Sequence, residues 1–146
     1  MGLACSHGAF EGSYGDFLRL RKAVCKTLGG SYPPHYKEGT EIESNMLPDI
    51  DETMDKHMFY LPDEITKEKY PGLWEFLTHS DYNGSIKPNM CKKVAHDLES
   101  LVLPQIQEHD PLLHRGVEKW TCVYMLTNFI AGCRQAHKER RCLLFR

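Results

Sequence analysis

Three stretches of this chain repeat apolar residues at every third or fourth position, the spacing that places side chains on one face of an α-helix. This pattern predicts helices over residues 13–28, 91–106 and 115–138. The third stretch carries apolar residues on more than one face, which is typical of a helix at the centre of a bundle. We therefore expect an all-α fold, a compact bundle of about four helices, in a single domain spanning residues 1–146.

Residues with strong positional preferences mark where the helices begin and end. Ser13 is a suitable N-cap for the first helix, and the pair Gly29-Gly30 ends it. A short helical pair is expected over residues 63–78, broken at Pro71. Pro88 suits the first position of the next helix. Pro104 predicts a kink near the end of that helix.

The segment 31–63 breaks the helical pattern and is predicted to be irregular. Prolines and glycines recur along it, and the stretch from Glu38 to Glu64 holds nine acidic residues against a single lysine. A long loop within a compact domain is usually functional or mobile. We interpret this acidic segment as a polyanion that binds a host protein. The carboxylates proposed for that contact are Asp49, Asp51, Glu52 and Asp55.

Charge and cysteine pattern bear on the class of protein. The formal net charge of −2 argues against a general electrostatic attraction to nucleic acid. No apolar run reaches the roughly 18–20 residues of a membrane helix. The six cysteines form no C-x-x-C pair, and Cys25, Cys91 and Cys122 fall on the apolar faces of expected helices. We therefore expect buried thiols, no membrane partner and a location in the reducing cytoplasm of a host cell.

The glycine-rich start of the chain leads directly into a basic helix. Glycines allow close approach of the backbone to a ligand, and the N–H groups at the start of a helix attract anions. We predict that this region binds a small anionic ligand, without any cofactor. The residues proposed for it are His7, Ser13, Tyr14, Arg19 and Lys22.

Three alternatives use other residues. Cys5 with His7 as its base is the alternative for a hydrolase or transferase, although the sequence nominates no third group to orient the imidazole. The pair Gly2 and Ser6 fits a myristoylation pattern, beside which Cys5 could be palmitoylated.

The third alternative is a degenerate EF-hand-like loop over residues 79–86, in which Asp81, Asn83 and Ser85 would hold a cation. His79 and Met90 occupy the positions of its first carboxylate and its bidentate glutamate. This sequence therefore favours a simple turn with Gly84 at positive φ, and no metal.

A longer pattern resembles a known family. The string PGLWEFLTHSDYNGSIKPNMCKKVAHDLESLVLP begins at Pro71, and FIAGCRQA follows it near the end, while GLACSH begins at Gly2. These segments resemble a family of small uncharacterised phage and bacterial proteins. Members carry a more acidic loop of the HSDCDGEI kind, three positions of which are occupied here by Tyr82, Asn83 and Ser85. The resemblance implies a phage or prophage setting and no particular activity.

Together these observations favour a small, non-enzymatic, phage-encoded accessory protein over an enzyme. It would act against host defence by binding a host protein or by sequestering a small anionic, nucleotide-like ligand. A homo-oligomer is left open by the sequence.

Overall fold

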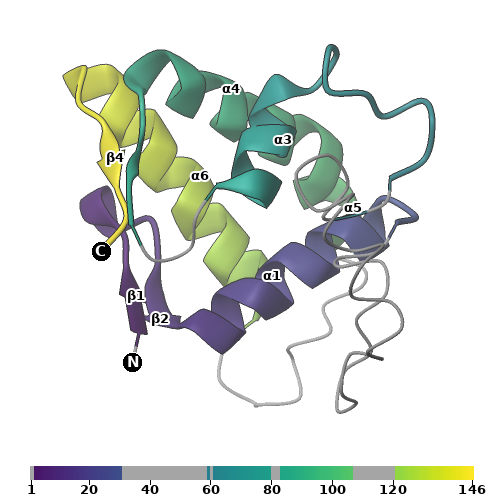
Figure 1. Ribbon diagram of the computed structural model, residues 1–146, viewed down its shortest axis with the longest axis horizontal. Coiled ribbons are helices and arrows are strands. Elements are labelled where there is room, and N and C mark those ends of the chain that lie inside the picture. Colours follow the sequence, from purple (N-terminus) through teal and green to yellow (C-terminus); the bar gives the residue numbers. More distant parts are fainter. Residues whose placement is uncertain (1, 31–58, 60, 80–82, 107–120) are drawn as a thin grey trace, which may run out of the picture.

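The described part of the chain is mostly helical, with two small sheets beside the helices (Figure 1). The computed structural model describes residues 2–30, 59, 61–79, 83–106 and 121–146. Its α-helices are α1 (Tyr14–Thr27), α3 (Pro71–Thr78), α4 (Pro88–Asp97), α5 (Leu103–Ile106) and α6 (Cys122–Glu139). The acidic segment proposed to bind a host protein falls outside these residues, apart from its last few positions.

Helix α6 lies at the centre of the packing, as its apolar residues on several faces predict. It packs most extensively against α4 and also contacts α1 and α5. Leu126, Phe129 and Cys133 of α6 are completely buried. The helix begins after Thr121, whose side-chain oxygen accepts a hydrogen bond from the backbone N–H of Tyr124 at 3.1 Å.

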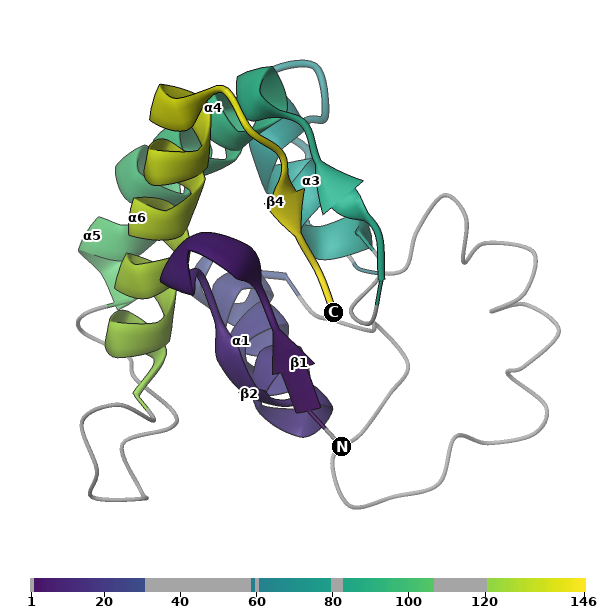
Figure 2. The same cartoon turned by 90° about the vertical axis from the view of Figure 1, so that its left-hand side faces the viewer.

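Four short strands correct the all-α expectation. β1 (Gly2–Ala4) pairs antiparallel with β2 (Glu11–Ser13), and β3 (Ser85–Ile86) pairs antiparallel with β4 (Leu143–Leu144). Cys5 forms a β-bridge with Phe145, so the hairpin lies against the end of the chain (Figure 2). Strands of two or three residues are too short to show a period of two in the sequence, which is why the pattern did not reveal them.

The two ends of the chain are joined through this bridge. The backbone N–H of Ala4 donates to the carbonyl oxygen of Arg146 at 2.9 Å, and the N–H of Arg146 donates to the carbonyl oxygen of Ala4 at 3.1 Å. Leu143 and Phe145 are buried beside these bonds. The C-terminal residues are therefore part of the core structure.

A proline occupies the first position of both α3 and α4. Pro71 begins α3, and residues 63–70 form turns where the first half of a helical pair was expected. Pro88 begins α4, as predicted. A π-helical turn, Leu98–Val102, precedes α5 and its Pro104, the residue at which a kink was expected. Proline lacks an N–H and its ring clashes with the carbonyl four residues earlier, so the α-helical ladder widens just before it.

Aromatic rings fill the space between α1, α3 and α6. The ring centroids of Phe10 and Phe17 lie 4.9 Å apart, and those of Phe76 and Phe129 lie 5.0 Å apart. Phe145 joins this group from the end of the chain, 6.1 Å from Phe17. Such edge-to-face pairs add to the stabilisation from burial.

Burial of the core-facing cysteines is confirmed. Cys25, Cys91 and Cys122 have no exposed surface, and every cysteine of the chain is a free thiol. Among the described residues, no helix is long and apolar enough to cross a membrane.

Candidate functional site

The structure separates the residues that the sequence grouped into an N-terminal anion site. His7 lies in the turn that joins β1 and β2, whereas Ser13 ends β2 at the opposite end of the hairpin. Glu11, which is nearest the turn, and Ser13 are themselves separated by roughly 7 Å of extended strand. The structure does not bring His7 and Ser13 together, and the ligand predicted for them stays a prediction.

The other members of that predicted group lie at the start and middle of α1. The hydroxyl oxygen of Ser13 accepts a hydrogen bond from the backbone N–H of Asp16 at 3.0 Å, so Ser13 is the N-cap that the sequence predicts. Tyr14 is half-buried against the core. Arg19 and Lys22 are half-buried further along the helix.

Cys5 is not placed as a nucleophile. Its side chain is buried, and burial raises the pKa of the thiol to about 12, although the positive charge of Arg21 opposes that rise. The reactive form of cysteine is the thiolate, which such a thiol does not supply at neutral pH. The same burial leaves Cys5 inaccessible to a palmitoyl group.

His7 instead has two other polar neighbours. Its Nδ1 atom lies 2.8 Å from the hydroxyl oxygen of Ser6, and its Nε2 atom lies 3.3 Å from Oε1 of Glu139 at the end of α6. His7 adopts a left-handed backbone conformation with φ of 60°. Glu139 is the third group that the sequence could not nominate, because it lies at the far end of the chain.

The positive φ predicted for Gly84, which follows α3, is confirmed at 94°. The His79 ring packs on Phe145 with centroids 4.2 Å apart, and its Nε2 atom lies 3.1 Å from the carbonyl oxygen of Ser85. Asp81 lies outside the described residues, whereas Asn83 and Ser85 are described and exposed. In the part of the chain that is described, no three potential metal-binding side chains come together.

The carboxylates proposed to bind a host protein, Asp49, Asp51, Glu52 and Asp55, also lie outside the described residues.

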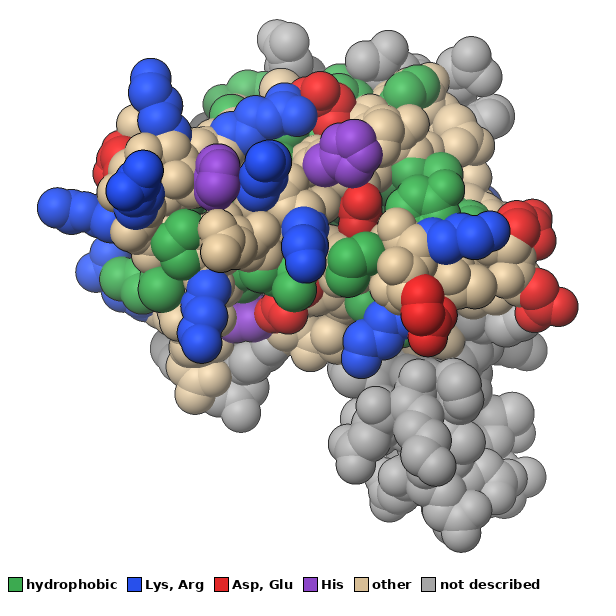
Figure 3. Space-filling view, turned by 90° about the horizontal axis from the view of Figure 1, so that it is seen from above, with side chains coloured by type: hydrophobic (Ala, Val, Ile, Leu, Met, Phe, Trp, Pro, Cys, Tyr) green, Lys and Arg blue, Asp and Glu red, His purple; other side chains and the backbone are tan. Residues whose placement is uncertain are grey.

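A hollow of about 680 Å³ opens between the start of α3, the exposed face of α4 and the end of α6. Lysine and histidine side chains gather over this face of the molecule (Figure 3). The cationic or titratable side chains that line it are Lys69, Lys92, Lys93, His96 and His137, and the acidic ones are Glu68 and Asp97.

The Asp97 side chain contributes to the stability of the fold rather than to the accessible surface of the hollow. Its side chain is only 4% exposed, and its Oδ2 atom accepts a hydrogen bond from the backbone N–H of Leu73 at 3.0 Å. Asp97 of α4 thus caps the start of α3. Burial raises the pKa of this carboxyl, although hydrogen bonds from the backbone of Leu73 and Gly72 work in the opposite direction.

His137 is held by a backbone contact. Its Nδ1 atom lies 3.1 Å from the carbonyl oxygen of Pro88, which can only accept, so Nδ1 carries the proton. This contact fixes the orientation of the His137 ring beside the hollow.

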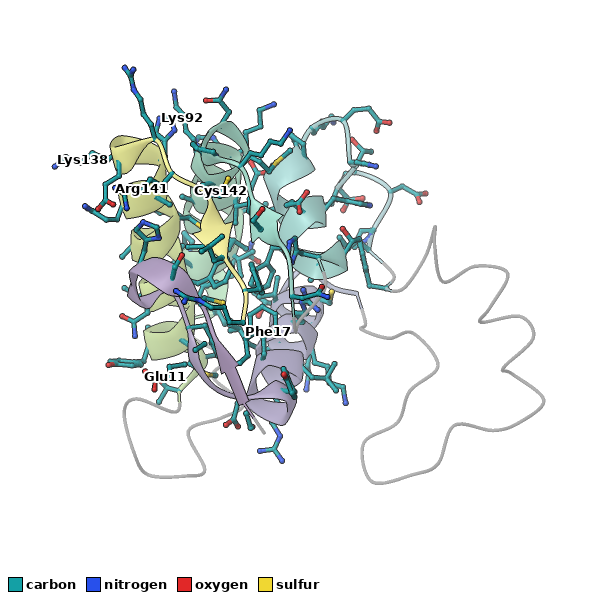
Figure 4. The ribbon with its side chains drawn as sticks, turned by 60° about the vertical axis from the view of Figure 1, so that its left-hand side comes forward. Glu11, Phe17, Lys92, Lys138, Arg141 and Cys142 are labelled. Atoms are coloured by element: carbon teal, nitrogen blue, oxygen red, sulfur yellow. The ribbon has the colours of Figure 1, made fainter. Side chains whose placement is uncertain are left out.

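The positive surface continues beyond the hollow. Lys92, Lys138 and Arg141 project from the same end of the molecule, whereas Glu11 lies at the opposite end (Figure 4). Lys92, Lys138 and Arg141 are all exposed. The sequence showed the basic run from Lys138 to Arg141, but the separation of α4 and α6 along the chain concealed that the two helices share one face.

Comparison of the chain with protein-family models, with curated proteins and with solved structures finds no match. The resemblance to small phage and bacterial proteins therefore stays a prediction.

Proposed function

We propose that this chain is a small accessory protein that captures a small anionic, nucleotide-like ligand in the hollow over α4. The observation that supports the proposal is the set of side chains around it: three lysines and two histidines against two carboxyls. One of those carboxyls, Asp97, is buried and bonded to the start of α3. The accessible part of the hollow is therefore predominantly positive.

The chemistry of the lining favours a phosphate-bearing ligand. Lysine ammonium groups bind phosphate as mobile point charges with three donors each. Lys92 and Lys93 are exposed neighbours on α4, and His137 reaches the same hollow from α6. A volume of about 680 Å³ falls in the usual range for small-molecule sites.

The test compares two charge reversals of equal size. The variant Lys92→Glu/Lys93→Glu removes the proposed site, and Arg19→Glu/Lys22→Glu changes the same charge on α1, where the sequence placed the ligand. Melting temperatures are measured with inorganic pyrophosphate and with linear and cyclic nucleotides. Ligand at about 100 times its Kd stabilises by about 2.7 kcal/mol, which raises Tm by several degrees.

We expect at least one phosphate ligand to raise the Tm of the wild-type protein and of Arg19→Glu/Lys22→Glu, but not that of Lys92→Glu/Lys93→Glu. The reverse pattern would place the ligand on α1 and contradict the proposal. No shift of the wild-type protein with any of these ligands at millimolar concentration would also contradict it.

A further inference from the structure

The turn between β1 and β2 brings a hydroxyl, an imidazole and a carboxylate into one chain of contacts. The hydroxyl oxygen of Ser6 lies 2.8 Å from Nδ1 of His7, and Nε2 of His7 lies 3.3 Å from Oε1 of Glu139. A nucleophile that is hydrogen-bonded to a base, with the base oriented by a carboxylate, is the arrangement that activates serine for covalent catalysis. These residues are separate from the hollow over α4.

The hydrogen bonds determine which nitrogen carries the proton. Because a carboxylate can only accept, Nε2 of His7 donates to Glu139, and Nδ1 of the neutral ring accepts the proton of the Ser6 hydroxyl. In this tautomer the lone pair of Nδ1 faces the Ser6 hydroxyl, which is the arrangement that a general base requires.

Two further hydrogen bonds fix the positions of Ser6 and Glu139. The backbone N–H of Leu144 donates to the hydroxyl oxygen of Ser6 at 2.8 Å. The side chain of Gln135 donates to Oε2 of Glu139 at 2.5 Å, which leaves Oε1 for His7. This bond, with His7 and Arg141 nearby, lowers the pKa of Glu139, so this side chain is a carboxylate at neutral pH.

All three side chains of the group are partly exposed. Ser6 is half-buried, and the side chain of His7 retains 13% of its exposure and that of Glu139 retains 39%. The left-handed backbone of His7, at φ 60° and ψ 20°, is uncommon for a residue other than glycine. Such conformations are concentrated at functional sites.

From this geometry we propose that Ser6, His7 and Glu139 form a site that hydrolyses small carboxylic esters. The Ser6 oxygen bonds to the ester's acyl carbon while its proton moves to Nδ1 of His7. The carbon–oxygen bond to the leaving alcohol then breaks, and the alcohol departs with that proton. Water, deprotonated by His7, attacks the acyl-serine, which releases the carboxylic acid and restores the Ser6 hydroxyl. Glu139 stabilises the imidazolium formed in each half of the reaction.

The test uses p-nitrophenyl acetate as substrate and a fluorophosphonate as a covalent probe of the nucleophile. We expect the wild-type protein to release nitrophenol with a burst and to carry the acetyl group or the phosphonate on Ser6, as located by peptide mass spectrometry. Ser6→Ala should lose the adduct. His7→Gly should lower the rate about 100-fold or more, and Glu139→Gln about tenfold.

The variants separate catalysis from folding. Glycine accepts positive φ without a steric penalty, so His7→Gly should keep the fold while it loses the base. Ser100→Ala, at an exposed serine in the π-helical turn, serves as the control and should retain the wild-type rate and adduct. A wild-type protein without an adduct at Ser6, or a Ser6→Ala variant that hydrolyses at the wild-type rate, would overturn the proposal. Neither outcome depends on anion binding over α4.

Discussion

A single buried arginine connects α1 to the end of α3. Arg21 is only 4% exposed, and its Nε atom donates to the carbonyl oxygen of Phe76 at 3.0 Å. A second guanidinium N–H donates to the carbonyl oxygen of His79, and the group lies 4.5 Å from the centre of the Phe17 ring. Arg21 therefore satisfies carbonyl groups that the end of α3 would leave without helical partners.

Replacing Arg21 by methionine should lower the free energy of unfolding by about 2–4 kcal/mol, because buried carbonyls would lose their donors. Urea denaturation measures this change. Arg134→Ala serves as the matched control, since Arg134 binds Glu99 at the surface and such pairs contribute about 1 kcal/mol or less. Equal losses for the two variants would contradict this role for Arg21.

Asp97 links protonation to stability. Because burial raises its pKa in the folded state, the contribution of Asp97 is fully present below the unfolded pKa and is lost as the pH rises through the folded pKa. Asn at this position keeps an acceptor for Leu73 and buries no charge. The stability of Asp97→Asn relative to the wild-type protein should therefore increase as the pH rises from about 4 to 7.

Asp97→Ala removes the acceptor as well, so at each pH it should be about 0.5–2 kcal/mol less stable than Asp97→Asn, as expected for the loss of a helix cap. Urea denaturation at several pH values follows both variants. A constant difference between the Asn variant and the wild-type protein would show that the carboxyl is not perturbed by burial.

At the scale of elements, two glycines set how closely neighbouring segments pack. A Cβ at Gly72 of α3 would lie 2.2 Å from the carbonyl carbon and oxygen of Lys93 in α4. A Cβ at Gly132 of α6 would lie 2.5 Å from the Cβ of Ala9 in the hairpin turn. These positions have no room for a methyl group, and the backbone atoms they face cannot turn aside.

Gly72→Ala and Gly132→Ala should each lower stability by about 1–3 kcal/mol through overpacking. Gly15→Ala is the control, because its Cβ would meet only the Ser13 hydroxyl oxygen at 3.6 Å, and alanine favours a helix by about 1 kcal/mol. Thermal denaturation of the three variants tests the prediction. It would be wrong if Gly15→Ala were the most destabilised of them.

Local signals explain which elements the sequence could predict. The apolar period and the Ser13 cap located α1, which spans Tyr14–Thr27, and Pro88 located the start of α4. β1 pairs with β2, which follows it closely in the sequence, whereas β3 pairs with β4, which lies near the C-terminus. Pairing of that kind leaves no local pattern.

The candidate sites likewise combine residues that lie far apart in the sequence. His7 was found from the sequence because it lies in a glycine-rich turn, but its partner Glu139 lies at the end of α6. The hollow over α4 likewise combines residues of three helical regions. Both candidate sites depend on tertiary packing, which brings together residues that are far apart in the sequence.

At the scale of the whole molecule, the last four residues complete the core. Leu143 is fully buried and Phe145 is 4% exposed. Deleting residues 143–146 removes two buried side chains, each contributing about 2–5 kcal/mol, which is comparable with the entire stability of a domain. We expect this deletion to abolish the cooperative unfolding transition followed by circular dichroism.

Leu144→Ala is the control for the deletion, since Leu144 is 41% exposed and its backbone pairing is unaffected. It should unfold cooperatively, within about 1 kcal/mol of the wild-type protein. A truncated protein that melts like this control would show that the tail is dispensable.

The mutual bonds between Ala4 and Arg146 also affect the order of events during translation. At about 5–20 residues per second, the ribosome needs roughly 7–27 seconds to deliver the tail after the hairpin has emerged. During that interval Leu3 and Phe10, both buried in the finished protein, have no completed core to enter. The hairpin therefore completes its bridge to the tail only after Arg146 has left the exit tunnel.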